Sequence, residues 1–436
     1  MIQERIWQGL VLSCCLGLLQ GTIATADEWP QWRGPERDGV WRETGIIKAF
    51  PEKPMKPLWE MPIAGGYSSP SVARDKVYVT DRLIEPTQEE RIHCFDRKTG
   101  KSLWTHAYEC IYRNVGYQAG PRASVLIVED RAYALGTMGD FFCLNADTGK
   151  VLWHRPLNEE YGIRMPIWGI AASPIAYENL VIVQIGGQEG SCLVAFDQKS
   201  GEEVWRSMPD EASYSAPILI EQAGEEVLVC WTGEHIAGLD PAKGTVFWKV
   251  PFPPKRMVIS ISTPVVSGNM LFVTSFYDGS KMVELSPDKL EAKEKWHFVG
   301  PNERRTEALQ SIIATPVFEG DYIYGVDSYG QLRCLSAETG ERIWESQEAT
   351  PYARWSNIHI VKQEDRYWLF NERGDLIIAQ LSPEGYQEIS RTKVIEPTTI
   401  QLNQRGGVCW AHPAYAHRCV FVRNDEKIIC YDLSKQ

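Results

Sequence analysis

A repeat that ends in tryptophan constrains the fold of this chain more than any other feature of its sequence. Each copy holds a polar residue (usually Asp), a short polar segment, Gly and a final Trp, as in residues 145–153 and 335–344. Five full copies and one degraded copy end at Trp104, Trp153, Trp205, Trp248, Trp296 and Trp344. These tryptophans are separated by 49, 52, 43, 48 and 48 residues. Such a period predicts an architecture built from one repeated supersecondary unit.

Each repeat predicts four short strands. Apolar residues before the Asp read as a strand, the polar segment with Gly makes a tight turn, and the run to Trp is the next strand. Upstream, a dipeptide that ends in Pro precedes a short apolar run and a β-branched strand. These dipeptides are Ser69-Pro70, Ser173-Pro174, Ala216-Pro217, Thr263-Pro264, Thr315-Pro316 and His412-Pro413. A four-stranded unit of this length is typical of a propeller blade.

The count of repeats predicts an all-β, eight-bladed β-propeller. Six blades end at the tryptophans from Trp104 to Trp344, and a weaker seventh runs from about Trp355 to Gly385. The eighth starts at Ala411 and lacks its last strand, whereas residues 57–61 carry the sequence of that strand. We therefore expect the N-terminal strand to complete the last blade and close the ring without an exposed edge. Seven tryptophans stand near the end of a blade's last strand: Trp59, Trp104, Trp153, Trp205, Trp248, Trp296 and Trp344.

The N-terminal residues predict an exported protein of the periplasm or cell envelope. Residues 1–26 resemble a signal peptide, with Arg5, an apolar run and a small-residue cleavage site before Asp27. Residues 27–56 form an arm rich in Trp and Pro that we expect to pack on the ring, and residues 57–436 form the propeller. The apolar run falls short of the roughly 20 residues of a membrane-spanning helix. No transmembrane span is predicted.

Composition excludes several classes of function. The formal net charge of −12 argues against a nucleic-acid binder. The cysteines at repeated blade positions, such as Cys94 and Cys143, read as small buried hydrophobes, while a bridge between Cys409 and Cys419 stays open. No metal-ligand spacing, P-loop or nucleophile elbow occurs, so we predict no catalytic residues and no metal ligands.

The candidate binding site lies in the loops that lead from the outer strand of one blade to the inner strand of the next. Basic and aromatic residues gather in six of these eight loops. They are Arg113, Arg122, Arg164, Trp168, Lys255, Arg256, Arg304, Arg305, Arg354, Trp355, Arg405 and Trp410. Arg pairs with carboxylates and aromatic planes stack, so the loops predict a mouth for an anionic ligand or an acidic protein segment. The alternative is that the arginines pair with acidic residues of the same loops, namely Glu159, Glu160, Glu303, Glu307 and Glu348.

The repeat resembles the tryptophan-docking motif of pyrroloquinoline quinone (PQQ) repeat propellers, over about residues 57–436. The resemblance implies that the seven tryptophans named above dock one blade on another, each packing against the turn of the next blade. The resemblance implies one of two branches: quinoprotein dehydrogenases, which hold PQQ and calcium in the channel, or propellers similar to BamB, which bind protein. The dehydrogenases carry a pair of adjacent cysteines against PQQ, and the only such pair here, Cys14-Cys15, lies in the predicted signal peptide. Their calcium ligands and catalytic Asp find no matching motif in this chain.

These observations favour a non-catalytic binding scaffold. We expect a monomer that binds a protein partner or an anionic small molecule at the propeller mouth, with no cofactor and no nucleic acid. Two alternatives stay open: a PQQ- and calcium-dependent dehydrogenase of small alcohols or sugars, and a propeller that binds polysaccharide through exposed aromatic residues.

Overall fold

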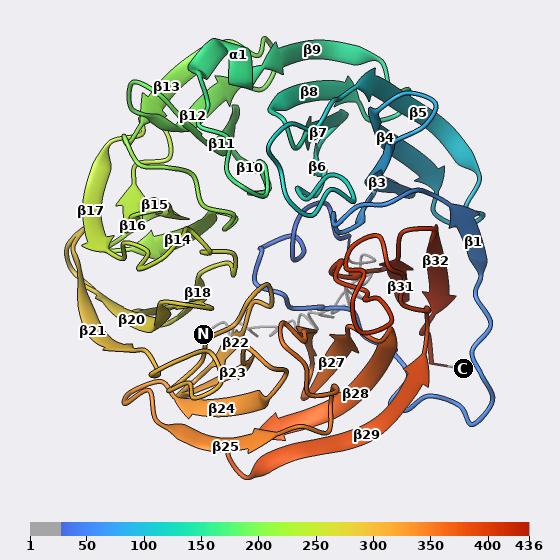
Figure 1. Cartoon of the computed structure of the whole chain (residues 1–436), viewed down its shortest axis with the longest axis vertical. Helices are drawn as coiled ribbons and strands as arrows, with labels where there is room; N and C mark the ends of the chain where they lie inside the picture. The colour runs from blue at the N-terminus through green and yellow to red at the C-terminus, as the bar shows by residue number, and fades with distance from the viewer. Residues whose placement is uncertain (1–27, 436) are drawn as a thin grey trace, which may run out of the picture.

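The structure, a computed structural model, describes residues 28–435, so the predicted signal peptide at residues 1–26 lies outside the described part of the chain. Eight four-stranded antiparallel sheets surround a central axis, as Figure 1 shows. The prediction of an all-β, eight-bladed propeller is confirmed. In residues 28–435 no helix is long and apolar enough to cross a membrane.

The blades follow one another along the chain, each running from its inner to its outer strand. The first blade is β2 (Ser71–Ala73), β3 (Lys76–Leu83), β4 (Glu89–Asp96) and β5 (Ser102–Glu109), and the second is β6 (Leu126–Val128), β7 (Arg131–Leu135), β8 (Asp140–Asn145) and β9 (Val151–Pro156). The third blade is β10 (Ile175–Tyr177), β11 (Leu180–Gly187), β12 (Ser191–Asp197) and β13 (Glu203–Ser207). The fourth is β14 (Ile218–Gln222), β15 (Glu225–Trp231), β16 (His235–Leu239) and β17 (Val246–Pro251). A short helix, α1 (Leu157–Tyr161), follows β9.

The remaining strands complete the ring. The fifth blade is β18 (Val265–Ser267), β19 (Met270–Ser275), β20 (Gly279–Leu285) and β21 (Ala292–Phe298), and the sixth is β22 (Val317–Glu319), β23 (Tyr322–Val326), β24 (Leu332–Ser336) and β25 (Arg342–Ser346). The seventh blade is β26 (Ile358–Gln363), β27 (Arg366–Asn371), β28 (Asp375–Ser382) and β29 (Gly385–Lys393). The eighth is β30 (Ala414–Ala416), β31 (Cys419–Arg423) and β32 (Lys427–Asp432) with β1 (Trp59–Pro62). In the last blade β1 pairs with β32, and Trp59 lies opposite Cys430. The predicted closure by the N-terminal strand is therefore confirmed.

The core lies between neighbouring blades, because the middle strands are covered on both faces. All eight residues of β11 are buried, whereas the outer strand β5 exposes every second residue. One cluster of buried side chains joins Tyr133 and Phe141 of the second blade to Val183 and Phe196 of the third. All nine described cysteines are buried free thiols, so Cys409 and Cys419 form no bridge here.

The repeat turn follows from its residues. In the first copy the Asp96 Oδ1 accepts hydrogen bonds from the Thr99 backbone N (2.8 Å) and hydroxyl (2.7 Å). Gly100 has a φ of +71°, which glycine adopts without steric cost. A Cβ on Gly100 would lie 2.7 Å from the ring of Trp59, so the turn glycine also lets the previous blade's tryptophan pack on it.

Six of the seven predicted docking tryptophans donate to a carbonyl in the repeat turn of the next blade. Trp104 Nε1 bonds Ala146 O at 3.0 Å, and Trp153 Nε1 bonds Gln198 O at 3.1 Å. The others are Trp59, Trp205, Trp296 and Trp344, with Arg97, Pro241, Ala337 and Ser382 as acceptors. The repeated contact ties each of these blades to its neighbour.

Trp248 docks by a relay instead. Its Nε1 donates to Gln222 Oε1 in the same blade at 2.9 Å. The Gln222 amide nitrogen then donates to carbonyls of the next blade, including Glu291 O at 2.8 Å. The degraded repeat at residues 286–296 lacks the glycine turn on which Trp248 would pack, which explains the difference.

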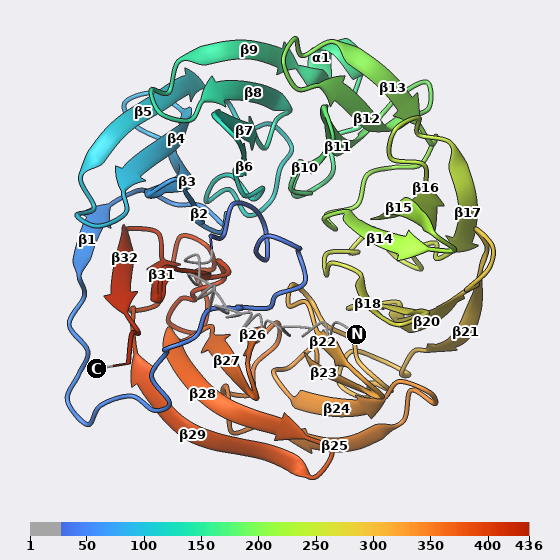
Figure 2. The same cartoon turned by 180° about the vertical axis from the view of Figure 1, so that it is seen from behind.

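The first part of the arm crosses the centre of the ring and contacts the inner strands, and the rest runs along the outside of the ring to β1 (blue in Figures 1 and 2). On the way, the Phe50 backbone N donates to Ser390 Oγ of the outer strand β29 at 3.0 Å. Trp29 pairs with Val72 in the first blade, and the Trp41 backbone N donates to Lys362 O in the seventh at 2.8 Å. The Arg37 guanidinium donates to Pro217 O at 3.0 Å, to Ser173 O at 3.2 Å and to Pro174 O. The arm thus packs on the ring, as predicted, and its first part fills the ring's centre.

Candidate functional site

Eight loops carry the chain from one blade to the next on one face of the ring; we call them the mouth loops. They are residues 63–70, 110–125, 157–174, 208–217, 252–264, 299–316, 347–357 and 394–413. All twelve predicted binding residues lie in these loops.

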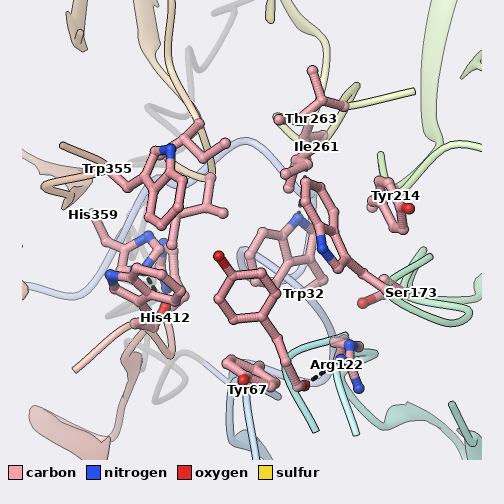
Figure 3. A pocket seen from close by; sticks show the side chains of 18 of the residues that line it. Trp32, Tyr67, Arg122, Ser173, Tyr214, Ile261, Thr263, Trp355, His359 and His412 are labelled. Carbon is pink, nitrogen blue, oxygen red and sulfur yellow. Dashed lines mark hydrogen bonds between the residues drawn. The ribbon is translucent and has the colours of Figure 1, made fainter. Parts of the chain in front are cut away.

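The mouth loops surround a central cavity of about 200 Å³, which we call the cup. Its wall draws on all eight blades, and Figure 3 shows Tyr67, Arg122, Tyr214 and Trp355 arranged around it. Its complete lining is Trp32, Tyr67, Tyr117, Arg122, Trp168, Ala171, Ser173, Tyr214, Ala216, Met257, Ile259, Ile261, Thr263, Tyr277, Ile312, Ile313, Trp355, His359, Trp410 and His412. A concave, mostly apolar site with few polar groups is the usual form of a ligand pocket.

One repeated position supplies a ring of eight lining residues, one from each blade. In the six blades with the Pro dipeptide, this is the third residue before that Pro. In blade order the inner ring is Tyr67, Arg122, Ala171, Tyr214, Ile261, Ile313, Trp355 and Trp410. The same backbone position in every blade therefore points at the axis, and only its side chain varies.

The cup is not symmetric. Blades seven, eight and one contribute Trp355, Trp410 and Tyr67, whereas blades five and six contribute Ile261 and Ile313. Further aliphatic residues on that side, among them Ile259 and Ile312, thicken the wall. Aromatic side chains therefore gather on one arc of the ring and aliphatic ones on another, while Tyr214 of blade four lies across the cup from Trp355 (Figure 3).

The arm and two histidines form the deep end of the cup. Trp32 donates a hydrogen bond from Nε1 to Thr263 Oγ1 at 2.8 Å (Figure 3). Its ring centroid lies 5.4 Å from that of His412. The imidazoles of His359 and His412 lie 4.8 Å apart. Burial, with the Arg33 guanidinium nearby, lowers the pKa of His359 to about 4. Burial and the neighbouring His359 lower the pKa of His412 as well, so both rings are neutral at pH 7.

Arg122 is the single charged side chain in the lining of the cup. It donates to backbone carbonyls, with Nη1 to Gly120 O at 2.6 Å and Nη2 to Gly116 O at 2.9 Å. Its guanidinium lies 5.0 Å above the Tyr67 ring. No carboxylate of residues 28–435 pairs with it, so its charge is held in place but not neutralised.

Eight of the twelve predicted residues lie outside the cup: Arg113, Arg164, Lys255, Arg256, Arg304, Arg305, Arg354 and Arg405. Three of them form ion pairs, and one of the three partners, Glu303, is among the acidic residues that the alternative interpretation named. Arg354 pairs with Glu303 at 2.7 Å, Arg405 with the buried Glu372 at 2.6 Å, and Arg164 with Glu211.

The other five show no ion pair within residues 28–435. Arg256 lies 5.0 Å over the Tyr277 ring, and Arg304 lies 5.8 Å over Tyr329. Arg113, Lys255 and Arg305 are exposed cations. The structure therefore brings Arg122, Trp168, Trp355 and Trp410 together in the cup and leaves a partly paired cationic rim outside it.

Sequence reasoning missed most of the cup. It passed over the two loops without basic residues, at 63–70 and 208–217, yet these supply Tyr67 and Tyr214. The sequence does mark the missed inner-ring residues, because each lies three residues before the Pro of a Pro dipeptide. They are Tyr67, Ala171, Tyr214, Ile261 and Ile313. No local signal marks Trp32, which reaches the cup from the arm.

One group of three possible metal ligands occurs among the described residues: Asp210, Glu234 and His235. The Asp210 Oδ2 already accepts hydrogen bonds from Thr232 Oγ1 at 2.5 Å and from His235 Nδ1 at 2.8 Å. The buried carboxylate therefore holds the turn between β15 and β16 in place. The group lies apart from the cup lining.

Comparison with known proteins places this architecture in a family. The sequence matches the family model described as "Outer membrane protein assembly factor BamB" over residues 43–106, 88–346 and 189–436, which overlap and together reach from 43 to 436. The chain belongs to this family of PQQ-like repeat propellers. The predicted resemblance is confirmed.

Individual relatives of the PQQ-like repeat chain come from both branches. Polyvinylalcohol dehydrogenase of a Pseudomonas species is 24% identical over 264 residues, which are 55% of this chain and 36% of the relative. The chain thus spans about a third of that enzyme's length. Among solved structures, BamB of Moraxella catarrhalis has a TM-score of 0.58 at 15% identity and covers 87% of this chain and 99% of its own. Quinohemoprotein alcohol dehydrogenase of Comamonas testosteroni has a TM-score of 0.51 at 12% identity, with 94% and 81% covered. At such identities the two structures share the fold alone.

Proposed function

We propose that this chain is an exported, non-catalytic binding propeller whose cup takes a protein segment or an anionic small molecule. The observation that carries the proposal is the composition of the cup. Aromatic and aliphatic side chains form its walls, and its single charge is the unneutralised guanidinium of Arg122. Such a site favours a ligand that offers an apolar surface together with a negative group.

The cationic rim supports an acidic ligand over a neutral one. Arg113, Lys255 and Arg305 are exposed in three different mouth loops and show no ion pair within residues 28–435. The chain as a whole has a net charge of −12, so cations around one opening concentrate the attraction for anions there. The family name, which describes an outer-membrane-protein assembly factor, supports a protein partner and a site of action outside the cytoplasm.

The similarity to polyvinylalcohol dehydrogenase favours one second candidate, an enzyme with PQQ and calcium in the cup. Calcium in proteins takes six to eight oxygen ligands, chiefly carboxylates and carbonyls. The lining contains no Asp, Glu, Asn or Gln, and its side-chain oxygens are hydroxyls such as those of Ser173 and Thr263. The residues of the cup therefore do not fit the calcium half of that pair, and they offer no carboxylate to act as a base.

A binding titration tests the proposal. The probe is the fluorescein-labelled peptide Asp-Asp-Trp-Asp-Asp, and its anisotropy is followed as the mature chain is added. We expect micromolar binding that weakens several-fold when the salt concentration rises from about 0.05 M to about 0.5 M, because screening removes the attraction of the exposed rim. The same titration with a neutral β-glucan oligosaccharide addresses the polysaccharide alternative, for which binding would survive the added salt.

A blocking variant locates the binding. Ala171→Trp fills the inner ring at its smallest member and should abolish peptide binding. The matched control, Ala49→Trp, adds the same side chain at an exposed position of the arm and should bind as the wild type does. Unchanged binding by the Ala171→Trp protein would show that the peptide binds elsewhere, and the proposal would fail.

A further inference from the structure

Tyr117 fills a space that three tryptophans from other mouth loops enclose. Its ring centroid lies 6.0 Å from Trp168, 6.4 Å from Trp355 and 6.2 Å from Trp410. The first two contacts are edge-to-face, at interplanar angles of 74° and 80°, an arrangement that stabilises aromatic pairs. We call Trp168, Trp355 and Trp410 the tryptophan cage.

The backbone of Tyr117 is held firmly. Its φ is +52°, a left-handed conformation that costs a non-glycine residue free energy. Its carbonyl accepts a hydrogen bond from Arg122 Nη2 at 2.5 Å, and the preceding Gly116 donates from its backbone N to Ile167 O at 2.6 Å. The loop therefore fixes where the side chain starts and directs it into the cage.

The side chain itself has no directional anchor. No hydrogen bond joins the Tyr117 hydroxyl to any of residues 28–435, and the residue is only half-buried. Most buried or half-buried tyrosines place the hydroxyl on a partner, as Tyr67 does on Gln401 O at 3.1 Å. A pinned backbone with a ring held by stacking alone can release the ring by side-chain rotation without unfolding the loop.

The surroundings of the cage indicate what could replace this ring. Arg122 lies on one side, and the Arg354 guanidinium lies 4.4 Å over Trp355 on another. The unpaired cations Arg113, Lys255 and Arg305 are exposed in three different mouth loops and do not line the cup, so a ligand that contacts them and the cage must extend out of the cup. An aromatic residue within an acidic peptide segment matches both features.

We propose that the tryptophan cage is a subsite for an aromatic side chain of an acidic protein segment, and that Tyr117 occupies it until the segment displaces the ring. This inference rests on the proposed binding function and specifies its ligand. Because the ring must leave first, the free chain binds more weakly than an empty cage would, in proportion to the fraction of molecules with the cage open.

Substitutions at Tyr117 test the competition. Tyr117→Gly empties the cage and suits the positive φ, so the loop conformation is retained. We expect it to bind the Asp-Asp-Trp-Asp-Asp peptide roughly tenfold more tightly than the wild type does. Tyr117→Phe keeps the ring and should bind as the wild type does. Trp410→Ala should weaken binding roughly tenfold, because it removes one wall of the cage and the ring contact that this wall offers.

Two controls separate this inference from the proposed function. Tyr352→Ala removes an exposed tyrosine that stacks on Tyr329 outside the cup and should leave affinity unchanged. The peptide Asp-Asp-Leu-Asp-Asp keeps the charge without the ring and should show no gain with Tyr117→Gly.

The outcomes are distinguishable by calorimetry. If the wild type binds the tryptophan peptide but Tyr117→Gly binds it equally or more weakly, the inference is overturned and the proposed function stands. An equal gain for the leucine peptide would also overturn it, because the cage would then not select a ring. If neither the wild type nor Tyr117→Gly binds either peptide, the binding of acidic segments fails as a whole.

Discussion

His359 and His412 are the titratable residues at the deep end of the cup, and burial keeps both imidazoles neutral. His359 Nε2 lies 2.8 Å from Trp410 O and 3.1 Å from Asn357 Nδ2. The Arg33 guanidinium beneath them is also buried, and its pKa is lowered to about 10. A proton on either histidine would therefore place a second charge next to a buried cation.

The depressed pKa of His359 predicts a loss of stability in acid. The unfolded chain binds a proton at this residue near pH 6.5 and the folded chain near pH 4. The contribution of neutral His359 to the free energy of unfolding is therefore fully present above pH 6.5. It is lost as the pH falls toward 4, by up to about 3 kcal/mol. His359→Gln should show a shallower decline in its urea unfolding midpoint between pH 7 and pH 4. Parallel declines for variant and wild type would contradict the assignment.

Between elements, the repeated tryptophan contact holds neighbouring blades together. The Trp153 ring packs against Gly201, where an added Cβ would lie 2.7 Å away, and its Nε1 bonds Gln198 O. Leu152, the adjacent residue on β9, faces outward and is 41% exposed. Trp153 therefore joins two blades, whereas Leu152 on the same strand does not, and the two residues form a matched pair for substitution.

Trp153→Ala should lower the free energy of unfolding by about 3 kcal/mol, because it leaves a cavity between the second and third blades and removes one hydrogen bond. Leu152→Ala should change it by less than about 0.5 kcal/mol, as is usual for an exposed side chain. Thermal melting followed by circular dichroism checks both. An unchanged melting temperature for Trp153→Ala would count against the docking role.

The arm acts as an element of the ring through Arg37. Its guanidinium bonds backbone carbonyls of the third and fourth blades, and its Nε bonds Gln31 Oε1 at 2.8 Å. The residue is 3% exposed, and burial lowers its pKa to about 9, so it stays charged at neutral pH.

Arg37→Met should destabilise the fold by about 3 kcal/mol, since it leaves three buried carbonyls without their charged donor. Lys48→Met, at an exposed position of the same arm, is the control and should have little effect. Urea unfolding measures both. Equal midpoints for the two variants would show that the arm only lies on the ring.

The elements of the fold could be predicted because each leaves a local mark. The turn with Asp96 and Gly100 and the tryptophan that follows recur in sequence, and the missing strand of the last blade has its own copy at Trp59. The relay through Gln222 could not be predicted, because it replaces a turn that the fifth blade lacks. Only part of the cup could be predicted, because the prediction relied on loops that carry basic residues, such as that of Arg122. It therefore omitted Tyr67 and Tyr214, and Ile261 and Ala171 look like ordinary loop residues.

At the scale of the whole molecule, an acidic ring carries a cationic rim around one opening. The net charge is −12, while exposed cations such as Arg113, Lys255 and Arg305 lie in the mouth loops. The arm covers the deep end of the channel and contributes Trp32 to the cup. The proposed acidic ligand would therefore enter from the mouth, where the exposed cations lie.

The most direct test of a binding role without catalysis is a titration of residues 27–436 with PQQ, with and without calcium, followed by dye-linked oxidation of small alcohols. We expect that calcium does not strengthen any binding of PQQ, because the cup lining holds no carboxylate or carboxamide, and that no dye is reduced. Calcium-dependent micromolar binding with alcohol-dependent dye reduction would contradict it and would place this propeller among the quinoprotein enzymes.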